Sequence, residues 1–233
     1  MHKIKVIIVD ALFTLFVPKD GMSRYEMSRR IIERLTGRDA NIDKVTLIYD
    51  EKRALWEEKL PPDHGKKWSI IDREIIRALF PDMAFDECDS YGTQMATEIL
   101  TDPSFYEVLP DTWSFLSESR NRRMRVVIGS NNDLEKLIAM VSHFGLSDLL
   151  YAVYASTEVG YEKPDPDFFR SIAHRERVRP EECIMIGNNP KNDVEGPQQA
   201  GLQAVLYDRR NEYCDFTGYR VSSFKDVLSL DIF

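Results

Sequence analysis

The chain has 233 residues, of which 43% are hydrophobic and 30% charged, which is the balance of an ordinary globular protein. This length is enough to bury one large core, or a core together with a smaller inserted unit. The formal net charge of −8 and the lack of an apolar run long enough to span a bilayer argue against nucleic acid and membrane, and we expect neither as a partner.

The first predicted element is a buried strand that runs directly into a carboxylate. Residues 6–9 are a continuous run of β-branched apolar side chains, as found in strands buried on both faces of a parallel sheet. Asp10 follows, and α/β sheets bind ligands just outside the carboxyl ends of their strands. An aspartate there can act as a nucleophile or hold a cation, although a turn that happens to contain Asp is the better explanation of this stretch when it is taken alone.

Residues from about 19 to about 102 form a mainly helical stretch divided by helix breakers. Apolar residues recur at helical spacing in four segments, namely 22–35, 42–60, 68–80 and 86–100. These segments end at Gly37, Pro61-Pro62, Pro81 and Pro103. Because no strand-like run lies among them, we predict an all-helical unit at residues 17–107, inserted between two parts of another domain.

Strand-like runs resume after this insert and alternate with helical patterns. The sequence predicts helices at 111–119, 134–144, 168–175 and 194–200. It predicts strands at 125–129, 149–154, 183–187 and 204–207. Strands that alternate with helices imply right-handed crossovers and a parallel sheet, so we expect an α/β core. An arginine cluster at positions 120, 122, 123 and 125 is interpreted as the solvated C-terminal end of the first of these helices.

Polar residues follow the predicted strands where the strands end. Ser130 and Asn131 end the second strand, Lys163 lies in the loop after the short third strand, and Asn188 and Asp193 follow the fourth. The carboxyl ends of parallel strands meet at one edge of a sheet, so these groups are expected near Asp10. A nucleophile, a hydroxyl, a fixed cation and a second carboxylate together suit phosphoryl transfer.

Each of these residues also has a plainer explanation when it is considered singly. Ser130-Asn131 and Asn192-Asp193 are good N-caps for the helices that follow them. Lys163 is compatible with a solvated loop lysine, which is the commoner state of a lone lysine. The order of all these groups and their placement at strand ends are much harder to explain by helix capping alone.

With these stretches in view, the chain resembles the haloacid dehalogenase superfamily, in the branch with a helical cap inserted after the first strand. The resemblance is carried by two segments, residues 160–169 (Gly-Tyr-Glu-Lys-Pro-Asp-Pro-Asp-Phe-Phe) and residues 184–201. The second segment keeps Gly187, Asn192-Asp193, Gly196 and Ala200-Gly201 in the family's order. The resemblance implies a Rossmann-like parallel sheet core at 1–16 and 108–233, a smaller all-helical cap at 17–107, and hydrolase activity.

The resemblance also implies roles for individual residues. Asp10 resembles the nucleophile that forms a covalent aspartyl intermediate. Thr14 and Ser130 resemble the phosphate-binding hydroxyls, and Asn131 is expected beside them among the substrate-binding residues. Lys163 resembles the lysine that neutralises the nucleophile and the phosphate, and it is expected to act in both catalysis and substrate binding.

A Mg²⁺ site is the cofactor site that the resemblance implies. Asp10 and Asp193 would supply carboxylates, Leu12 its backbone carbonyl, and Asn188 its side-chain carbonyl. The family usually has Asp where this chain has Asn188, so the site lacks one negative charge and is expected to hold the ion less tightly. The four histidines show no metal-ligand spacing and are assigned no role.

Other departures concern the loop after the nucleophile. Phosphatases of this family usually carry a second Asp, the general acid and base, where this chain has Leu12. Loss of such a group typically lowers the rate about a hundred- to ten-thousand-fold. Phe13 stands where Gly is usual, and it puts a bulky side chain beside the nucleophile.

These departures leave three functional hypotheses. The leading one is a Mg²⁺-dependent phosphatase that acts on a small phosphorylated metabolite through an aspartyl-phosphate. The alternative is hydrolysis of a 2-haloacid through an aspartyl ester at Asp10, since such dehalogenases also lack the second Asp and need no Mg²⁺. They usually have Asn where this chain has Pro190, however, and they need a cap arginine, for which Arg38 is a positional guess. The third is a catalytically impaired binding protein that kept the fold.

The expected partner is therefore a small-molecule substrate, either a phosphate ester or a haloacid. The protein is expected to be a monomer or a homodimer. Three scattered cysteines suit a reducing cytoplasm without structural disulfides.

Overall fold

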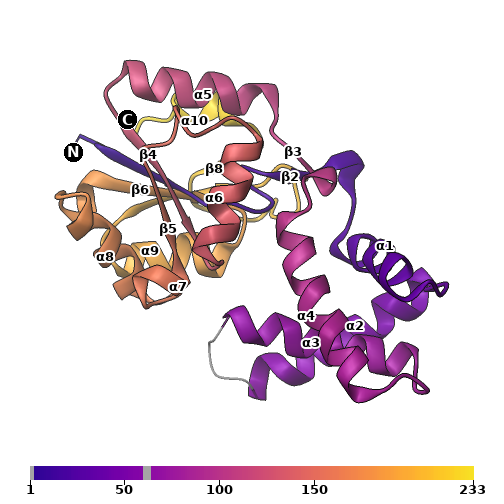
Figure 1. Ribbon diagram of the computed structural model, residues 1–233. Coiled ribbons are helices and arrows are strands. Elements are labelled where there is room, and N and C mark those ends of the chain that lie inside the picture. Colours follow the sequence, from indigo (N-terminus) through magenta and orange to yellow (C-terminus); the bar gives the residue numbers. More distant parts are fainter. Residues whose placement is uncertain (1–2, 60–63) are drawn as a thin grey trace. The chain divides into compact units, whose positions relative to one another are not determined.

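The computed structural model describes residues 3–59 and 64–233, which divide into two compact units (Figure 1). One unit, the α/β unit, contains the residues up to Val17 together with Glu107–Phe233. The other, the helical unit, is Pro18–Tyr106. The short strands β2 (Val17–Pro18) and β3 (Tyr106–Glu107) pair where the chain passes from one unit to the other.

A six-stranded sheet forms the centre of the α/β unit. Its strands are β1 (Val6–Val9), β4 (Arg125–Ser130), β5 (Ala152–Ala155), β6 (Cys183–Gly187), β7 (Gln203–Tyr207) and β8 (Arg220–Val221). They lie in the order β5-β4-β1-β6-β7-β8, and every neighbouring pair is parallel. The predicted fold class, a parallel α/β fold, is confirmed. The central strand β1 is fully buried, as its apolar run predicts.

Helices cover the sheet on both sides (Figure 1). They are α5 (Pro110–Asn121), α6 (Leu134–His143), α7 (Ser156–Val159), α8 (Pro166–Arg175), α9 (Gly196–Gln199) and α10 (Phe224–Val227). On one side, Phe168 and Ile172 of α8 pack in a cluster with Val6 and Ile8 of β1. In Figure 1, α5 and α10 lie above the sheet. Phe115 of α5 stacks on the ring of Phe224 in α10 at a centroid distance of 4.8 Å. This aromatic stacking stabilises the packing of α10 against α5.

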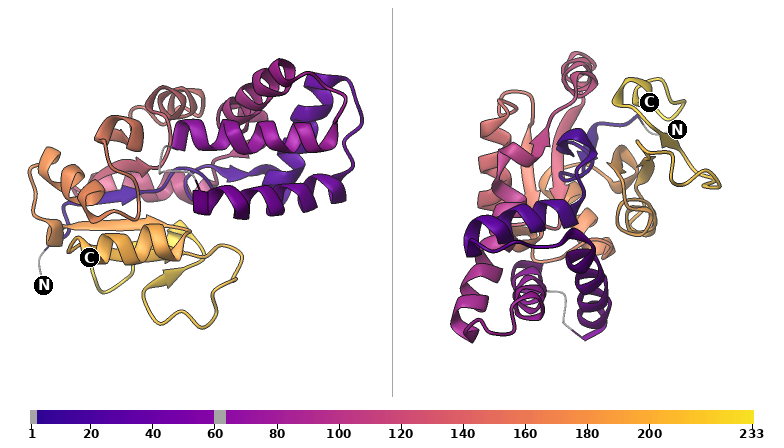
Figure 2. Two further views of the ribbon diagram at one scale, coloured as in Figure 1. Left: turned by 90° about the horizontal axis from the view of Figure 1, so that it is seen from below. Right: turned by 90° about the vertical axis from the view of Figure 1, so that its right-hand side faces the viewer.

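In its described residues the helical unit has four α-helices, and Figure 2 shows the structure from two further sides. They are α1 (Arg24–Thr36), α2 (Ile42–Lys59), α3 (His64–Leu79) and α4 (Phe85–Thr101). Gly37 ends α1, as the sequence predicts, and it does so in the left-handed conformation. Ser23, which was not predicted as a cap, accepts a hydrogen bond from the backbone N–H of Glu26 at the start of α1. Gly92 of α4 faces the backbone of Arg73 in α3, where a Cβ atom would lie only 2.5 Å from the Arg73 nitrogen, so glycine permits this close approach. Residue 60 of the predicted 42–60 segment and the breaker Pro61-Pro62 lie outside the described residues.

Several elements differ from their predicted bounds. The strand expected over 149–154 starts only at Ala152, because Leu149 and Leu150 both donate to the carbonyl of Leu146 and form a turn. The helix expected over 194–200 is replaced by a π-helical turn (η4, Pro190–Glu195) followed by the short α9. Strand β8 and helices α7 and α10 were not predicted, since two to four residues are too few to show a period.

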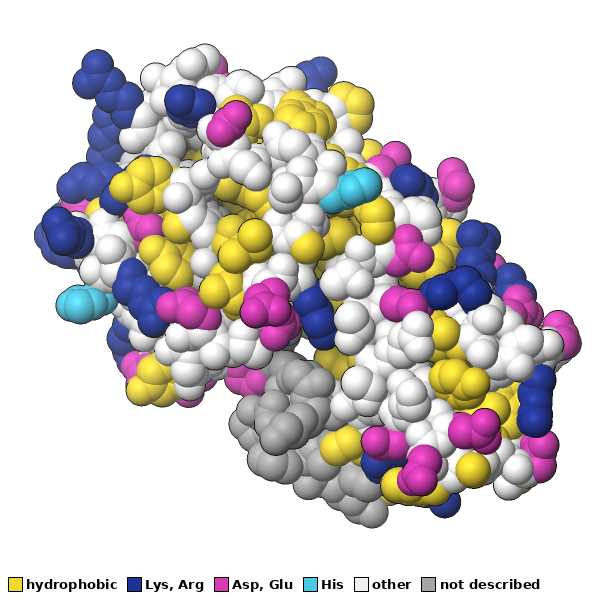
Figure 3. Space-filling model, viewed as in Figure 1, with side chains coloured by type: hydrophobic (Ala, Val, Ile, Leu, Met, Phe, Trp, Pro, Cys, Tyr) yellow, Lys and Arg dark blue, Asp and Glu magenta, His cyan; other side chains and the backbone are white. Residues whose placement is uncertain are grey.

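Surface and membrane properties can be stated for the described part of the chain. Charged side chains of both signs are interspersed over the face shown in Figure 3. Among residues 3–59 and 64–233, no helix has the length and apolarity that crossing a bilayer requires.

A buried carboxylate, Asp72 of α3, lies inside the helical unit without a hydrogen-bond partner on either oxygen. The guanidinium of Arg24 faces it, with Nη2 3.8 Å from Oδ2, too far for a hydrogen bond. Arg24 instead bonds to the hydroxyl of Tyr49 and lies 4.1 Å from the ring centroid of Trp68. Burial raises the pKa of Asp72 to about 7, and the Arg24 guanidinium opposes this rise only in part.

Replacing Asp72 with Asn is expected to stabilise the protein above neutral pH. The folded-state pKa of about 7 lies above the ordinary value of 3.8, so ionisation of Asp72 disfavours the folded state. The free energy of unfolding therefore falls as the pH rises from about 4 through 7, by as much as about 4 kcal/mol from Asp72 alone. Urea unfolding at pH 5 and pH 8 should show a smaller loss of stability in Asp72→Asn than in the parent. The exposed Asp89→Asn serves as the control, and parallel losses in all three proteins would contradict the prediction.

Candidate active site

Three charged side chains meet at the carboxyl ends of β1 and β6. Nζ of Lys163 donates hydrogen bonds of 2.7 Å to Oδ1 of Asp10 and 2.7 Å to Oδ1 of Asp193. All three are buried, with exposed fractions of 4% for Lys163, 8% for Asp10 and 1% for Asp193. Two carboxylates and one ammonium leave a net charge of −1 when all are ionised. Buried ionisable groups of this kind are uncommon unless they are paired, and they mark functional sites more often than structural ones.

Burial and mutual attraction shift the protonation equilibria of this group in different directions. Burial raises the pKa of Asp193 to about 6, the Lys163 ammonium opposes this rise, and the carboxylate of Asp10 adds to it. For Lys163, burial alone would lower the pKa, but the carboxylates of Asp10 and Asp193 outweigh burial and hold it above the usual value. Lys163 is therefore a fixed cation at neutral pH.

The local sequence explains why Asp193 can lie against the end of β6. A Cβ atom at Gly187 would overlap the carboxylate of Asp193, so only glycine leaves room for it. The backbone N–H of Asn189 donates to Oδ2 of Asp193 at 2.9 Å. In the same way, a Cβ at Gly196 would lie 2.5 Å from the carbonyl oxygen of Pro164, so glycine lets the Lys163 loop approach the start of α9. Gly187 and Gly196 thus act by allowing close contact.

The hydroxyl groups at the site are buried and bonded to amides. Oγ1 of Thr14 donates to Oδ1 of Asn188 at 3.3 Å, and Thr14 is fully buried. Ser130 ends β4, next to β1, and its Oγ accepts a 3.0 Å hydrogen bond from Nδ2 of Asn132. Asn132 was not singled out from the sequence, although its place in the run Ser130-Asn131-Asn132 was the available signal.

The loop after the nucleophile position contains no carboxylate. Residues 11–17 are apolar apart from Thr14. Leu12 pairs with Phe16 in a single β-bridge, and the backbone N–H of Phe13 donates to the Phe16 carbonyl at 2.8 Å. Phe13 has a φ of 65°, a left-handed conformation that costs about 1 kcal/mol or more for a residue with a side chain. The loop therefore keeps its backbone shape without the glycine that usually favours it, and offers no acid to a leaving group.

The Mg²⁺ ligands expected from the sequence are all oxygens, which suit a hard cation. They are the carboxylates of Asp10 and Asp193, which share the Lys163 ammonium, the amide oxygen of Asn188, which accepts from Thr14, and the backbone carbonyl of Leu12. Lys163 engages Oδ1 of Asp10, which leaves Oδ2 for another partner. In the described residues no group of three or more His, Cys, Asp or Glu side chains is arranged to hold a metal.

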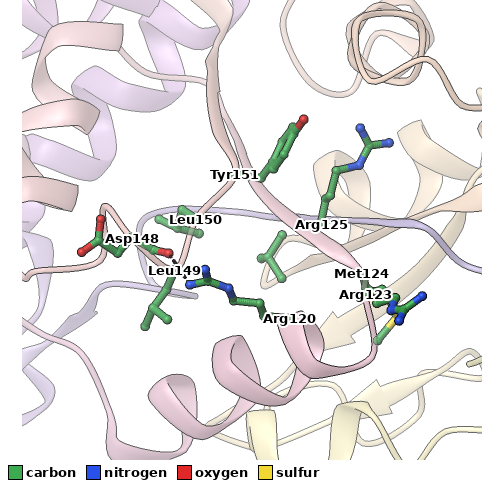
Figure 4. Close-up of a pocket in the computed structure, with 9 residues that line it drawn as sticks. Arg120, Arg123, Met124, Arg125, Asp148, Leu149, Leu150 and Tyr151 are labelled. Carbon is green, nitrogen blue, oxygen red and sulfur yellow. Dashed lines mark hydrogen bonds between the residues drawn. The ribbon is translucent and has the colours of Figure 1, made fainter.

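The arginine cluster lies elsewhere, around the amino-terminal end of β4 and so at the sheet edge opposite Ser130. There a pocket of about 290 Å³ is lined by Arg120, Arg123 and Arg125, among others (Figure 4). Arg120 donates to the backbone carbonyl of Asp148 at 3.1 Å. Arg125 forms a 2.9 Å ion pair with the buried Glu176, so it is not simply part of a solvated helix end, as the sequence interpretation had it. In Figure 4 the three guanidinium groups point in different directions and do not converge on one position.

Comparison with known sequences identifies one family and several relatives. The family model described as haloacid dehalogenase-like hydrolase matches residues 4–201. The phosphoserine phosphatase of Thermus thermophilus is 40% identical over 110 residues, which are 45% of this chain and 42% of that protein. The human N-acylneuraminate-9-phosphatase is 27% identical over 166 residues, which are 71% of this chain and 59% of that protein. The chain thus spans about half the length of these curated relatives.

Comparison with solved structures concerns the fold. The magnesium-bound HAD-hydrolase YfnB of Bacillus subtilis superposes with a TM-score of 0.77 at 14% identity, covering 98% of both chains. A 2-haloacid dehalogenase from Pseudomonas syringae superposes with a TM-score of 0.70 at 16% identity, covering 97% of both chains. A magnesium-bound hydrolase and a 2-haloacid dehalogenase therefore share this architecture, so the fold does not identify the reaction.

Proposed function

The chain belongs to the haloacid dehalogenase-like hydrolase family, and from this we propose that it is a phosphatase that hydrolyses a small phosphorylated metabolite through an aspartyl-phosphate on Asp10. The observation that carries the proposal is the buried lysine bonded to both Asp10 and Asp193. The names of the relatives, phosphoserine phosphatase and N-acylneuraminate-9-phosphatase, support phosphate esters as substrates. The helical unit, predicted as a cap at 17–107, is proposed to select the substrate.

In the proposed reaction, Oδ2 of Asp10 attacks phosphorus while the bond from phosphorus to the leaving oxygen breaks. The leaving oxygen keeps the bonding electron pair, and water then hydrolyses the aspartyl-phosphate and regenerates the carboxylate. The ammonium of Lys163 offsets the charge of the carboxylates and of the phosphoryl group. The hydroxyls of Thr14 and Ser130 are proposed to donate to phosphoryl oxygens, which for Thr14 requires exchange of its hydrogen bond to Asn188.

The donor set of Asp10, Asp193, Asn188 and the Leu12 carbonyl is proposed to hold Mg²⁺. When bound, this ion supplies positive charge that draws the dianionic phosphoryl group to the nucleophile. The chain's own contribution is to orient the Asp10 carboxylate through its hydrogen bond from Lys163.

Hydrolysis of a 2-haloacid is the second candidate, and the side chain of Leu12 favours it. A halide leaves without a proton, so a site with no acid at this position suits that chemistry as well as it suits an aryl or acyl phosphate. Attack by Asp10 on carbon would then form an ester and release the halide ion.

A screen of phosphate esters and 2-haloacids, each with Mg²⁺ and with EDTA, tests the proposal. We expect release of inorganic phosphate in Mg²⁺, its loss in EDTA, and its return when Mg²⁺ is restored. Release of halide that is insensitive to EDTA would favour the dehalogenase instead. A properly folded protein that turns over nothing in the screen would leave a binding role as the better conclusion.

A further inference from the structure

The side-chain amide of Asn131 is bonded at both ends to the backbone of one residue, Lys163. Nδ2 of Asn131 donates to the Lys163 carbonyl oxygen at 2.7 Å, and Oδ1 accepts from the Lys163 backbone N–H at 2.7 Å. The two residues are 32 positions apart in the chain. Two short hydrogen bonds to the same residue hold both the position and the orientation of its peptide groups.

These two hydrogen bonds fix the position of the Lys163 backbone, from which its side chain extends. A lysine stem has four flexible carbons, so placing its ammonium precisely costs rotamer entropy unless the backbone is anchored. The ammonium has to lie within 2.7 Å of both Asp10 and Asp193. After Lys163 the loop is held by the close approach of Pro164 to Gly196, and at Lys163 itself it is held by Asn131.

The same bonds limit what else the Asn131 amide can do. A carboxamide presents two N–H donors and one carbonyl oxygen in a single plane. That plane is set here by the Lys163 backbone, with one donor and the oxygen directed to it. Turning the amide toward a phosphoryl group would break two hydrogen bonds at a partly buried site, at about 1 kcal/mol or more for each bond.

We propose that Asn131 is a positioning residue that acts through Lys163 and does not itself bind the phosphoryl group. It holds the Lys163 backbone so that Nζ spans the nucleophile and the second carboxylate. This inference rests on the proposed phosphatase function and revises the sequence-based expectation that Asn131 binds substrate.

A double-mutant cycle on phosphate affinity tests the proposal. The proteins are the parent, Asn131→Ala, Lys163→Met and the double variant, and the readout is the Kd for inorganic phosphate by calorimetry in saturating Mg²⁺. We expect Asn131→Ala to weaken phosphate binding about tenfold in the parent background and less than twofold in the Lys163→Met background. The effects of residues that act through one another are not additive. The same weakening in both backgrounds, or none in the parent background, would overturn the proposal.

Two further measurements separate positioning from misfolding. Asn131→Asp is nearly isosteric but sets an oxygen against the Lys163 carbonyl, so it should match the loss of affinity in Asn131→Ala. Both variants should still unfold in one cooperative transition, with a midpoint lowered only by the loss of these hydrogen bonds. The exposed Asn121→Ala is the matched control and should change neither quantity.

A crystal structure of Asn131→Ala tests the geometry without relying on activity. We expect Nζ of Lys163 to leave hydrogen-bond distance of Asp10, Asp193 or both. If the parent neither binds phosphate nor hydrolyses any ester, the proposed function fails, and this structure alone decides the positioning role. An ammonium that still bridges both carboxylates at about 2.7 Å would show that Asn131 is not what holds it.

Discussion

Asp10→Asn is expected to lower the turnover of any phosphate ester by about four orders of magnitude or more, which is the scale of losses when a nucleophile is removed. An amide oxygen is a far weaker nucleophile than a carboxylate and leaves no stable acyl phosphate. The change is nearly isosteric, and the asparagine oxygen can still accept the hydrogen bond from Lys163. The fold should therefore survive while the chemistry is lost.

Single-turnover rates and acid-quench trapping of labelled phosphate provide the measurement. The parent protein should retain label on Asp10, and the variant should retain none. Asp167→Asn makes the same chemical change at an exposed residue of α8, paired only with Arg170 in a surface ion pair, and should behave like the parent. Turnover of Asp10→Asn within tenfold of the parent would contradict an aspartyl-phosphate mechanism.

Leu12→Asp is expected to accelerate hydrolysis of alkyl phosphates about a hundred- to ten-thousand-fold, the range associated with general acid catalysis. An alkoxide leaving group is strongly basic and needs a proton as the bond from phosphorus breaks. Aryl and acyl leaving groups are stable as anions, so their rates should change little. The Leu12 side chain is partly exposed, so a carboxylate can replace it without being fully desolvated.

The ratio of kcat/KM for glycerol phosphate to that for para-nitrophenyl phosphate is the quantity to compare. Leu12→Asn is the matched control, since it has the shape of aspartate and no acidic proton. The ratio should rise in the aspartate variant and stay near the parent value in the asparagine variant. An unchanged ratio in a folded, Mg²⁺-saturated Leu12→Asp protein would mean that a carboxylic acid at position 12 does not protonate the leaving group. A dehalogenase or binding role would then be better supported.

The elements predicted with the fewest errors are those whose side chains carry a long, regular pattern. Strand β1 matches its prediction, because four consecutive apolar β-branched residues suit a strand buried on both faces. Helix α1 ends where Gly37 predicts, because the left-handed conformation at its end favours glycine. Strand β5 starts three residues late, since its expected first residues form a turn onto Leu146, and an apolar run does not distinguish a turn from a strand.

The candidate site was predictable as a set of residues and not as a set of contacts. The order of polar groups at strand ends predicts that Asp10, Ser130 and Asn188 share one edge of the sheet. It does not predict that Lys163 bonds to both Asp10 and Asp193, because these contacts join residues 153 and 30 positions apart. They depend on the close approach that Gly187 and Gly196 allow.

The sequence by itself determined the chemistry available in the nucleophile loop, including the lack of an acid at Leu12, because no fold can add a carboxylate to residues 11–17. It also determined the alternation of strands and helices, which follows from side-chain periodicity. Only the tertiary structure decided that the Asn131 amide is bonded to the Lys163 backbone, and that Asp72 is buried without a hydrogen bond. Hydrogen bonding and burial depend on which distant segments lie within a few ångströms of each other, and that proximity is a property of the folded chain and not of any local stretch of it.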